Sequence, residues 1–204
     1  MNRTAFACTL IGLATVSAAE TFPVTEDAVF TFQGEEIVIS RTSVIAPATI
    51  TALTQISATC AAPCLSPMTI TENVATLGEL DVIQFLSSKV ETGDGLLVDA
   101  RNPDQRTGGI IPASVNIPAT TVSPENPYRN EIIMALGAEQ FEGIFDFSEA
   151  MSLVVFDAGP ATQDAQTLIF DLLGAGYPPE KIAYYRGGIQ VWTTLGLTTA
   201  EAPQ

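Results

Sequence analysis

The segment LVVFDAGPATQDAQTLIFDLL, residues 153–173, holds the side chains best placed to do chemistry. An apolar run stops at Asp157, a short loop with Gly159 and Pro160 follows, and a helical pattern begins after it. Strand-to-helix loops of this shape often present a nucleophile or bind an anion, because loop amides and the positive end of the next helix point into them. Asp157 therefore puts a carboxylate at the position where either function would be performed.

Three interpretations of Asp157 follow from the residues alone. In the favoured one, the carboxylate accepts hydrogen bonds from the amides of residues 159–162 and fills the anion-binding loop itself, although Pro160 has no N–H to donate. Such bonds would lower the pKa of Asp157. In the second interpretation, Asp157 faces solvent in a loop that has lost its function. In the third, Asp157 is a nucleophile of the phosphoaspartate kind, which needs a metal ion and a phosphate donor.

A second group with chemical potential is the pair Cys60 and Cys64 in TCAAPCLSP. In an exported protein a disulfide between them is the default expectation, and it closes a small ring, so its entropic stabilisation is modest. Two alternatives stay open: a reducible pair that works in redox or sulfur chemistry, and a metal site. The chain has no histidine, so a metal bound here would need carboxylates as further ligands. We expect no cofactor and no metal.

The first 19 residues, MNRTAFACTLIGLATVSAA, have the features of a cleavable signal peptide. Arg3 supplies the positive end, a short apolar run follows, and small residues precede a cleavage site after Ala19. The run is too short for a stable membrane anchor, and no later segment is long and apolar enough to span a bilayer. Cys8 would be discarded with the signal. The sequence thus predicts a periplasmic or secreted protein that begins at Glu20.

The charge of the chain excludes further classes of partner. Eight basic residues against 23 acidic ones give a net charge of −15 at pH 7. A field of this sign repels phosphate backbones and anionic lipid, so nucleic acid is not an expected partner. The same acidity helps to keep an exported domain soluble. The partners that stay open are another exported protein and a small anion.

The hydrophobic pattern divides the mature chain into an extension over residues 20–70 and a domain over residues 71–200. In the extension, AVFTFQGEEIVIS alternates on either side of Gln33-Gly34-Glu35 and predicts a β-hairpin. In the domain, Thr76 and Glu79 have capping-box spacing and predict the start of a helix. Strand-like runs then alternate with helical patterns, which predicts an α/β fold with a parallel sheet flanked by helices. The strand-like runs are GLLVDA, SVNIP, SLVVF and KIAYY, and the helical ones are NEIIMALGA, the segment from Ala165 to Gly174, and GGIQVWTTLG.

Two motifs in this domain resemble those of the rhodanese family of sulfurtransferases. LLVDARNPDQRTGGIIPASVNIP is similar to the family's strand ending in Asp-x-Arg and the Gly-His-Ile-Pro-Gly-Ala-x-Asn-Ile-Pro run after it. GYPPEKIAYYRGGIQVWTTLGL resembles the family's closing segment, in which Arg-Gly-Gly and a Trp lead to a final Gly. The matching residues are Asp99, Arg101, Ile111, Pro112, Asn116, Ile117, Pro118, Gly187, Gly188, Trp192 and Gly196. The resemblance covers residues 74–197 and extends to a secreted subset with a Cys-x-x-x-Cys segment upstream.

The resemblance implies a cysteine after the strand that enters the active loop, where it forms a persulfide and passes sulfur from a donor such as thiosulfate to a thiophilic acceptor. Asp157 occupies that position here, and a carboxylate cannot form a persulfide. Ala161 and Thr162 stand where the secreted subset has a Trp and a second loop cysteine, and Ile110 stands at the family's His. We therefore expect a catalytically degenerate loop. Its residues are Asp157, Ala158, Gly159, Pro160, Ala161 and Thr162.

Four further residues have expected roles. The resemblance implies that Asp99 and Arg101 are mainly structural, with the Arg tying loops together by charge-assisted hydrogen bonds. Trp192 lies in an apolar helix stripe and is expected in the core. Arg186 comes at the end of a parallel strand, where ligands bind in open α/β sheets, and is the best cationic candidate for a ligand contact.

The leading functional hypothesis is a binding or accessory module without sulfurtransferase activity. The first alternative is a sulfur-transfer or thiol redox protein that uses Cys60 and Cys64. The second alternative is a structural role in which the extension docks a partner. The fold by itself does not choose among these hypotheses.

Overall fold

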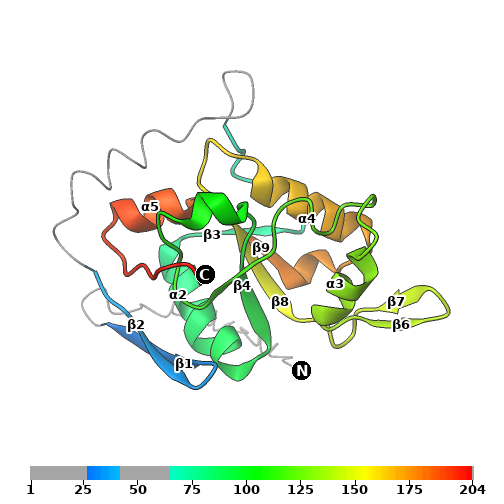
Figure 1. The fold of residues 1–204 in the computed structure, drawn as a ribbon, viewed down its shortest axis with the longest axis horizontal. Helices are drawn as coiled ribbons and strands as arrows, with labels where there is room; N and C mark the ends of the chain where they lie inside the picture. The colour runs from blue at the N-terminus through cyan, green and yellow to red at the C-terminus, as the bar shows by residue number, and fades with distance from the viewer. Residues whose placement is uncertain (1–26, 42–64, 204) are drawn as a thin grey trace, which may run out of the picture.

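A parallel β-sheet of five strands forms the centre of the computed structural model, which describes residues 27–41 and 65–203 (Figure 1). The order across the sheet is β3-β9-β8-β4-β5, and each neighbouring pair is parallel. The four strand-like runs of the sequence form strands as predicted, whereas β3 is too short to show in the pattern. The strands are β3 Ala75–Leu77, β4 Gly95–Asp99, β5 Ser114–Asn116, β8 Ser152–Phe156 and β9 Ile182–Tyr185. The predicted signal peptide, Cys60 and Cys64 lie outside the described residues.

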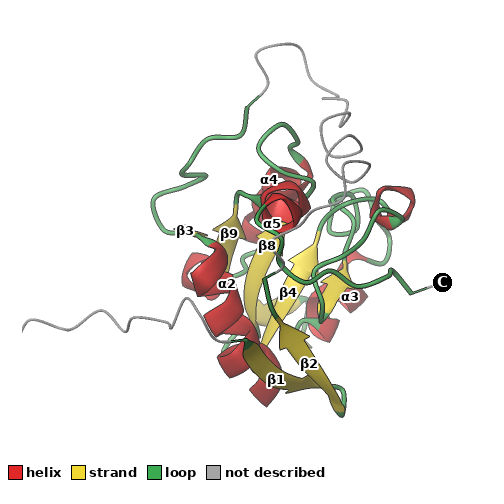
Figure 2. Ribbon diagram, turned by 90° about the vertical axis from the view of Figure 1, so that its left-hand side faces the viewer, coloured by secondary structure: helices red, strands yellow, loops and turns green. Residues whose placement is uncertain are grey.

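Helices cover both faces of the sheet, as predicted (Figure 2). Successive residues of a strand point to opposite faces, so β8 contributes Val155 to the core beneath α3 and α4, and Val154 to the core beneath α2 and α5. Trp192 of α5 is fully buried in the second core, as expected. The helices are α2 Glu79–Phe85, which continues into a π-helical turn over Leu86–Val90, α3 Arg129–Ala135, α4 Asp164–Gly174 and α5 Gly188–Thr194.

The predicted hairpin is present and packs against the domain. Strands β1 Ala28–Phe32 and β2 Glu35–Ile39 pair antiparallel across a two-residue turn. Gln33 and Gly34 have φ of 51° and 85°, which is the backbone of a type I′ turn. One face of the hairpin buries Phe30 and Ile39 in the same core as Trp192. This part of the extension is therefore continuous with the hydrophobic core of the domain.

One expected helix boundary is wrong. Thr76 lies in β3, where pairing with β9 keeps it extended, and α2 begins at Glu79 with Gly78 as its N-cap. The Gly78 amide donates to the Asp81 carboxylate at 2.9 Å, so the expected capping box of Thr76 and Glu79 does not form. Helix α4 ends at Gly174, as expected, and the left-handed residue after it is Gly176, with a φ of 94°.

The sequence pattern also missed a second antiparallel pair, β6 Glu139–Phe141 and β7 Ile144–Asp146. It forms a separate two-stranded sheet and projects from the body of the domain (Figure 1). Three residues on each side of a turn give too little alternation to recognise. Among the described residues, no helix is both long and apolar enough to cross a membrane.

Candidate functional site

The active loop begins at the carboxyl edge of the sheet, where β4 and β8 lie side by side. Asp99, the last residue of β4, pairs with Phe156, so Asp157 begins the loop one residue further along. The loop then enters α4 at Asp164. Neighbouring parallel strands end at the same edge of a sheet, and this topology brings Asp99 and Asp157 together.

Asp157 is fully buried, with 0% of its surface exposed. Its Oδ1 accepts a hydrogen bond from the Gly159 amide at 3.0 Å, and its Oδ2 accepts one from the Ala165 amide at 3.0 Å. Ala165 belongs to the first turn of α4, so the carboxylate lies at the positive end of that helix. The solvent-facing interpretation is wrong. The self-filled loop is present with one different donor, because the second amide comes from Ala165 rather than from residues 160–162.

The expected direction of the pKa shift is wrong. Burial raises the pKa of Asp157 to about 6, and the amide hydrogen bonds, which favour the ionised form, do not offset the loss of water. The neighbouring carboxylate of Asp164 raises this pKa further. The error has a physical cause, because sequence alone does not indicate how completely a loop residue is covered.

The loop rests on the turn between β9 and α5. Gly188 has a φ of 59°, and a Cβ at this position would lie 2.5 Å from the carbonyl oxygen of Asp157 and 2.7 Å from the amide nitrogen of Gly159. Ile189 donates its amide to the same Asp157 carbonyl at 3.1 Å. Gly188 of the Arg-Gly-Gly motif is therefore required by the close approach of two backbone segments.

Residues 65–67, called the strap below, contact the loop through Ser66, which is 2% exposed. Its amide donates to the Pro160 carbonyl at 2.7 Å, and its hydroxyl donates to the Thr162 carbonyl at 2.5 Å. Arg186 donates from Nε to the Ser66 carbonyl at 2.8 Å. The residue expected to contact a ligand thus holds the strap over the loop, and its role toward a ligand stays a prediction.

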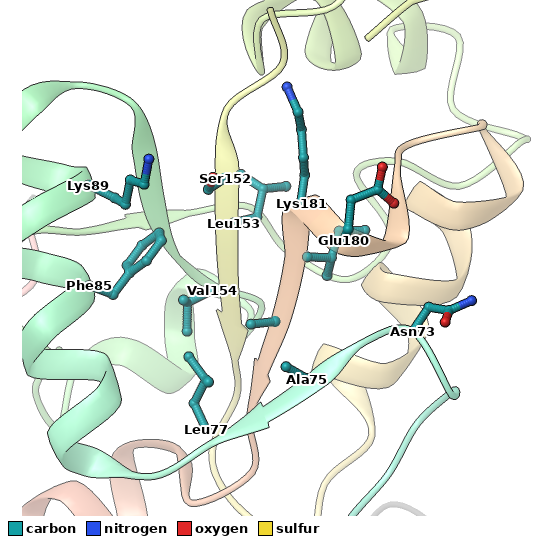
Figure 3. A pocket seen from close by; sticks show the side chains of 12 residues that line it. Asn73, Ala75, Leu77, Phe85, Lys89, Ser152, Leu153, Val154, Glu180 and Lys181 are labelled. Carbon is teal, nitrogen blue, oxygen red and sulfur yellow. The ribbon is translucent and has the colours of Figure 1, made fainter. Parts of the chain in front are cut away.

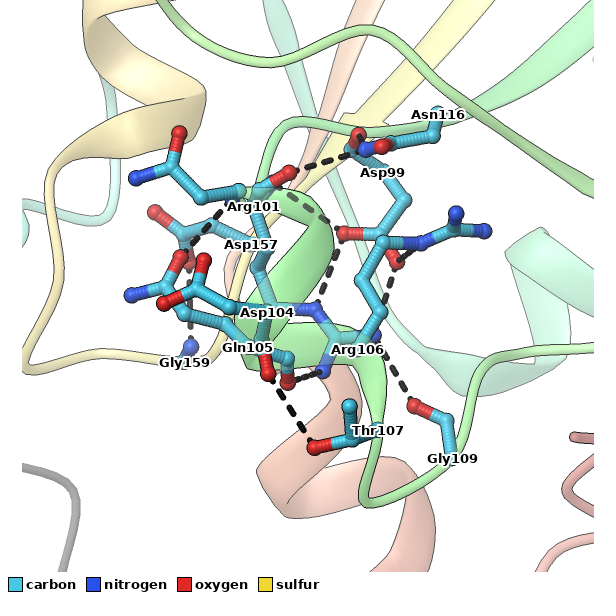
Figure 4. A network of polar contacts seen from close by, with 11 residues as sticks. Asp99, Arg101, Asp104, Gln105, Arg106, Thr107, Gly109, Asn116, Asp157 and Gly159 are labelled. Atoms are coloured by element: carbon cyan, nitrogen blue, oxygen red, sulfur yellow. Dashed lines mark hydrogen bonds and ion pairs between the residues drawn. The ribbon is translucent and has the colours of Figure 1, made fainter. Parts of the chain in front are cut away.

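Asp99 is the second buried carboxylate of the site (Figure 4). Arg101 binds both of its oxygens, from Nη2 to Oδ2 at 2.7 Å and from Nε to Oδ1 at 2.9 Å, and Arg106 adds a contact from Nε to Oδ2 at 3.1 Å. Arg101 also donates to the carbonyl oxygens of Gln105 and Gly109 at 3.0 Å. These bonds tie the segment after β4 to the end of that strand, which is the geometry of a structural pair.

A family model, the rhodanese-like domain, matches residues 83–195. The chain belongs to this rhodanese-like domain family. Among solved structures, similarity extends to a protein of unknown function from Rhodopseudomonas palustris CGA009, described as a possible tyrosine phosphatase. It has 19% identity and a TM-score of 0.46, and the match covers 79% of this chain and 98% of that one.

Two further structures are similar to this rhodanese-like chain. Thiosulfate sulfurtransferase from Pseudomonas aeruginosa has 18% identity and a TM-score of 0.43, and the match covers 64% of this chain and 21% of that one. A rhodanese-related protein from Thermoplasma volcanium has 17% identity and a TM-score of 0.41, with 62% and 97% covered. No curated protein matches the chain.

Sequence reasoning missed two residues of the rhodanese-like site, Arg106 and Ser66. Arg106 lies in a short 3-10 turn, Pro103–Arg106, and is 7% exposed despite its charge. Ser66 lies outside the matched residues, and its partners are backbone carbonyls nearly a hundred positions later in the chain. The contact of Ser66 has no local signal, because it depends on how distant segments fold together, whereas Arg106 lies only seven positions after its partner Asp99.

A groove of about 370 Å³ lies at the opposite end of β8 and β9 (Figure 3). It is lined by Val154 and Ala183 of these strands, with Leu77 and Phe85 beside them. Asp157 follows the other end of β8, so the groove is separate from the loop. Over residues 27–41 and 65–203, no three Cys, Asp or Glu side chains form a cluster able to hold a metal ion.

Proposed function

We propose that this protein is an exported rhodanese-like module that has no sulfurtransferase activity and acts by binding another protein. One observation carries the proposal: the carboxylate of Asp157 is buried and accepts the amides of Gly159 and Ala165. The sequence resemblance puts the family's cysteine at this position. Export rests on the predicted signal peptide of residues 1–19.

The chemistry of sulfur transfer supports this proposal. In the family reaction a thiolate attacks the outer sulfur of thiosulfate, sulfite leaves, and the sulfur is held as a persulfide until an acceptor takes it. A carboxylate oxygen has no comparable reaction with sulfur. The Asp157 carboxylate also uses two backbone amides, one in the loop and one in the first turn of α4, that would otherwise stabilise a bound anion.

The same geometry favours a protein over a small anion as the partner. An anion entering the loop would meet the negative charge of Asp157 above its pKa of about 6, and it would have to displace the bonds that Ser66 makes to Pro160 and Thr162. A protein partner can instead bind an outer surface and leave the loop as it is. The rhodanese-like fold then serves as a scaffold for recognition.

A thiosulfate–cyanide assay tests the proposal. The purified protein is expected to form no thiocyanate above background, with or without a thiol reductant. Asp157→Cys is expected to restore less than full family activity, because Pro160 still lacks an amide donor and Thr162 still holds the strap. Steady thiocyanate production by the unmodified protein would contradict the proposal.

A second function is favoured by the position of the strap. Cys64 lies outside the described residues, and in the sequence it precedes Ser66 by two positions. Ser66 is bonded to the active loop. If Cys60 and Cys64 do sulfur or redox chemistry there, the unmodified protein will turn over in the same assay and Cys60→Ser will abolish it. Asp157→Asn, the matched control, will then leave the turnover in place.

A further inference from the structure

The β6–β7 hairpin, residues 139–146 and called the finger below, ends in an exposed apolar pair. Phe141 and Ile144 are 77% and 75% exposed, the highest values among the large apolar side chains described. They are register partners on either side of the turn Glu142-Gly143. Directly opposed residues of an antiparallel pair point to the same face, so the two side chains form one apolar patch at the tip.

The register of the finger keeps this patch outward. Glu142 and Gly143 have φ of 49° and 83°, a type I′ turn that fixes the pairing. Gln140 and Phe145 are the next pair and face the other way, where Phe145 packs against the domain core. A shift by one residue would exchange the two faces. The register thus keeps the side chains of Phe141 and Ile144 exposed to solvent.

Aromatic packing and hydrogen bonds fix the base of the finger to the domain. Phe145, Phe147 and Tyr177 form a row of aromatic rings with centroids 5.7 and 5.3 Å apart. Lys181 donates from Nζ to the backbone carbonyl oxygens of residues 147, 148 and 150. A preformed apolar tip loses little conformational freedom when it binds, which favours its use as an anchor in a pocket.

The negative charge around the finger determines which kind of partner its tip can bind. Residues 130–180 contain five Glu and four Asp and no Lys or Arg. Glu139 and Asp146 are opposed at the base of the finger, on the same face as the apolar patch, and Glu142 stands at the turn. The two cations that flank this segment, Arg129 and Lys181, donate to backbone carbonyl oxygens.

We propose that the finger docks a partner protein through Phe141 and Ile144, which enter an apolar pocket rimmed by Lys or Arg. A second copy of this chain does not fit, because each carries a net charge of −15. An anionic lipid surface is repelled in the same way. The partner is therefore a basic protein surface, and attraction to it weakens with salt. This surface is independent of whether the loop at Asp157 is inactive.

The test begins with the full-length protein, immobilised and exposed to an extract of the cells that produce it. A protein recovered from that step is identified, purified and titrated against variants by biolayer interferometry. Phe141→Thr/Ile144→Thr, which keeps residues suited to strands, is expected to weaken its affinity by about 30-fold or more. Glu139→Gln/Glu142→Gln is expected to lower the association rate and the dependence on salt. Phe170→Thr, an exposed apolar side chain on α4, is the control and should change affinity less than about twofold.

Several outcomes would overturn the finger as a docking surface. The first is that no recovered protein depends on the tip for its binding, and the second is that the tip variant binds with the same affinity as the wild type. The third is self-association of the wild type that the tip variant abolishes, and the fourth is tip-dependent binding to phosphatidylcholine vesicles. Urea unfolding and circular dichroism establish that the double variant is folded. If it is not, the single variant Phe141→Thr carries the same comparison.

Discussion

One carboxylate is the last residue of β4 and another directly follows the neighbouring strand β8, and the protein buries the two in different ways. Asp99 and Asp157 are each 0% exposed. Asp99 has two guanidinium partners, Arg101 and Arg106, within 3.1 Å. Asp157 has two backbone amides at 3.0 Å instead. The charge of Asp99 is neutralised by two positive side chains, whereas the charge of Asp157 is stabilised by hydrogen-bond dipoles alone.

The difference separates a fixed structural element from a group that can change its charge. Amide dipoles recover part of the solvation that a carboxylate loses on burial, and the remainder appears as the raised pKa of Asp157. The full charges of Arg101 and Arg106 replace more of the solvation that Asp99 loses on burial. Removing one of these partners, however, leaves the others with an uncompensated buried charge. The comparison predicts that Asp99 is sensitive to loss of a partner and that Asp157 is sensitive to pH.

The largest effect is expected from Arg101→Leu. This change leaves the buried Asp99 with Arg106 as its one guanidinium partner, beside the backbone amide of residue 101, and removes the donor to Gln105 and Gly109. Breaking a buried ion pair by removing one partner costs about 3–5 kcal/mol. Urea unfolding at pH 7 measures the loss. The control Arg41→Leu removes an exposed arginine that donates to the Leu195 carbonyl, and it should cost less than about 1.5 kcal/mol. Equal losses in the two variants would contradict the special role of the Asp99 pair.

The pH dependence of Asp157 is the next largest effect. Its pKa of about 6 in the folded protein compares with roughly 3.9 in an unfolded chain. Between these values the folded state binds more protons at Asp157 than the unfolded state does. The contribution of Asp157 to the free energy of unfolding is therefore largest below pH 4 and is lost as pH rises through about 6. A shift of about two units corresponds to a loss of about 3 kcal/mol.

Asp157→Asn isolates this contribution, because the amide does not titrate. Urea unfolding of both proteins at pH 4, 5.5 and 7 should show the wild type losing about 3 kcal/mol relative to the variant. The variant is also less stable by an amount that does not change with pH, because the NH₂ group of its new side chain faces a backbone N–H donor. The opposite trend, in which the wild type gains on the variant toward pH 7, would mean that the amides of Gly159 and Ala165 outweigh burial.

The contrast between Asp99 and Asp157 also shows which features of the site can be predicted from the sequence. The strand ends and the loop follow from local patterns and from family motifs, because periodicity reflects nearby backbone. The pKa of Asp157 does not, since it depends on how completely the folded chain covers the carboxylate. Ser66 was missed for the same reason, because it contacts a segment distant in the chain, whereas Arg106 was missed because its contact depends on how the turn after β4 folds. The exposed finger, with three residues in each strand, was too short to predict.

The smallest effect expected is that of Ser66→Ala, and it tests whether the strap causes the burial of Asp157. The change removes the hydroxyl bond to the Thr162 carbonyl but keeps the amide bond to Pro160 and the contact of Arg186. A bond of this kind contributes about 1 kcal/mol, so the strap should loosen without leaving the loop. Ser88→Ala is the matched control, because it also removes a serine bond to a backbone carbonyl, that of Gln84, on an exposed helix surface.

A looser strap admits water to Asp157, and water favours the ionised carboxylate. The pKa of Asp157 should therefore fall toward its ordinary value, and the loss of stability between pH 4 and pH 7 should become smaller in Ser66→Ala than in the wild type. Urea unfolding across that range measures both effects, and hydrogen exchange at the Gly159 amide reports local opening. If Ser66→Ala keeps the full pH dependence while losing about 1 kcal/mol at every pH, then the loop and α4 bury Asp157 by themselves and the strap only rests on them.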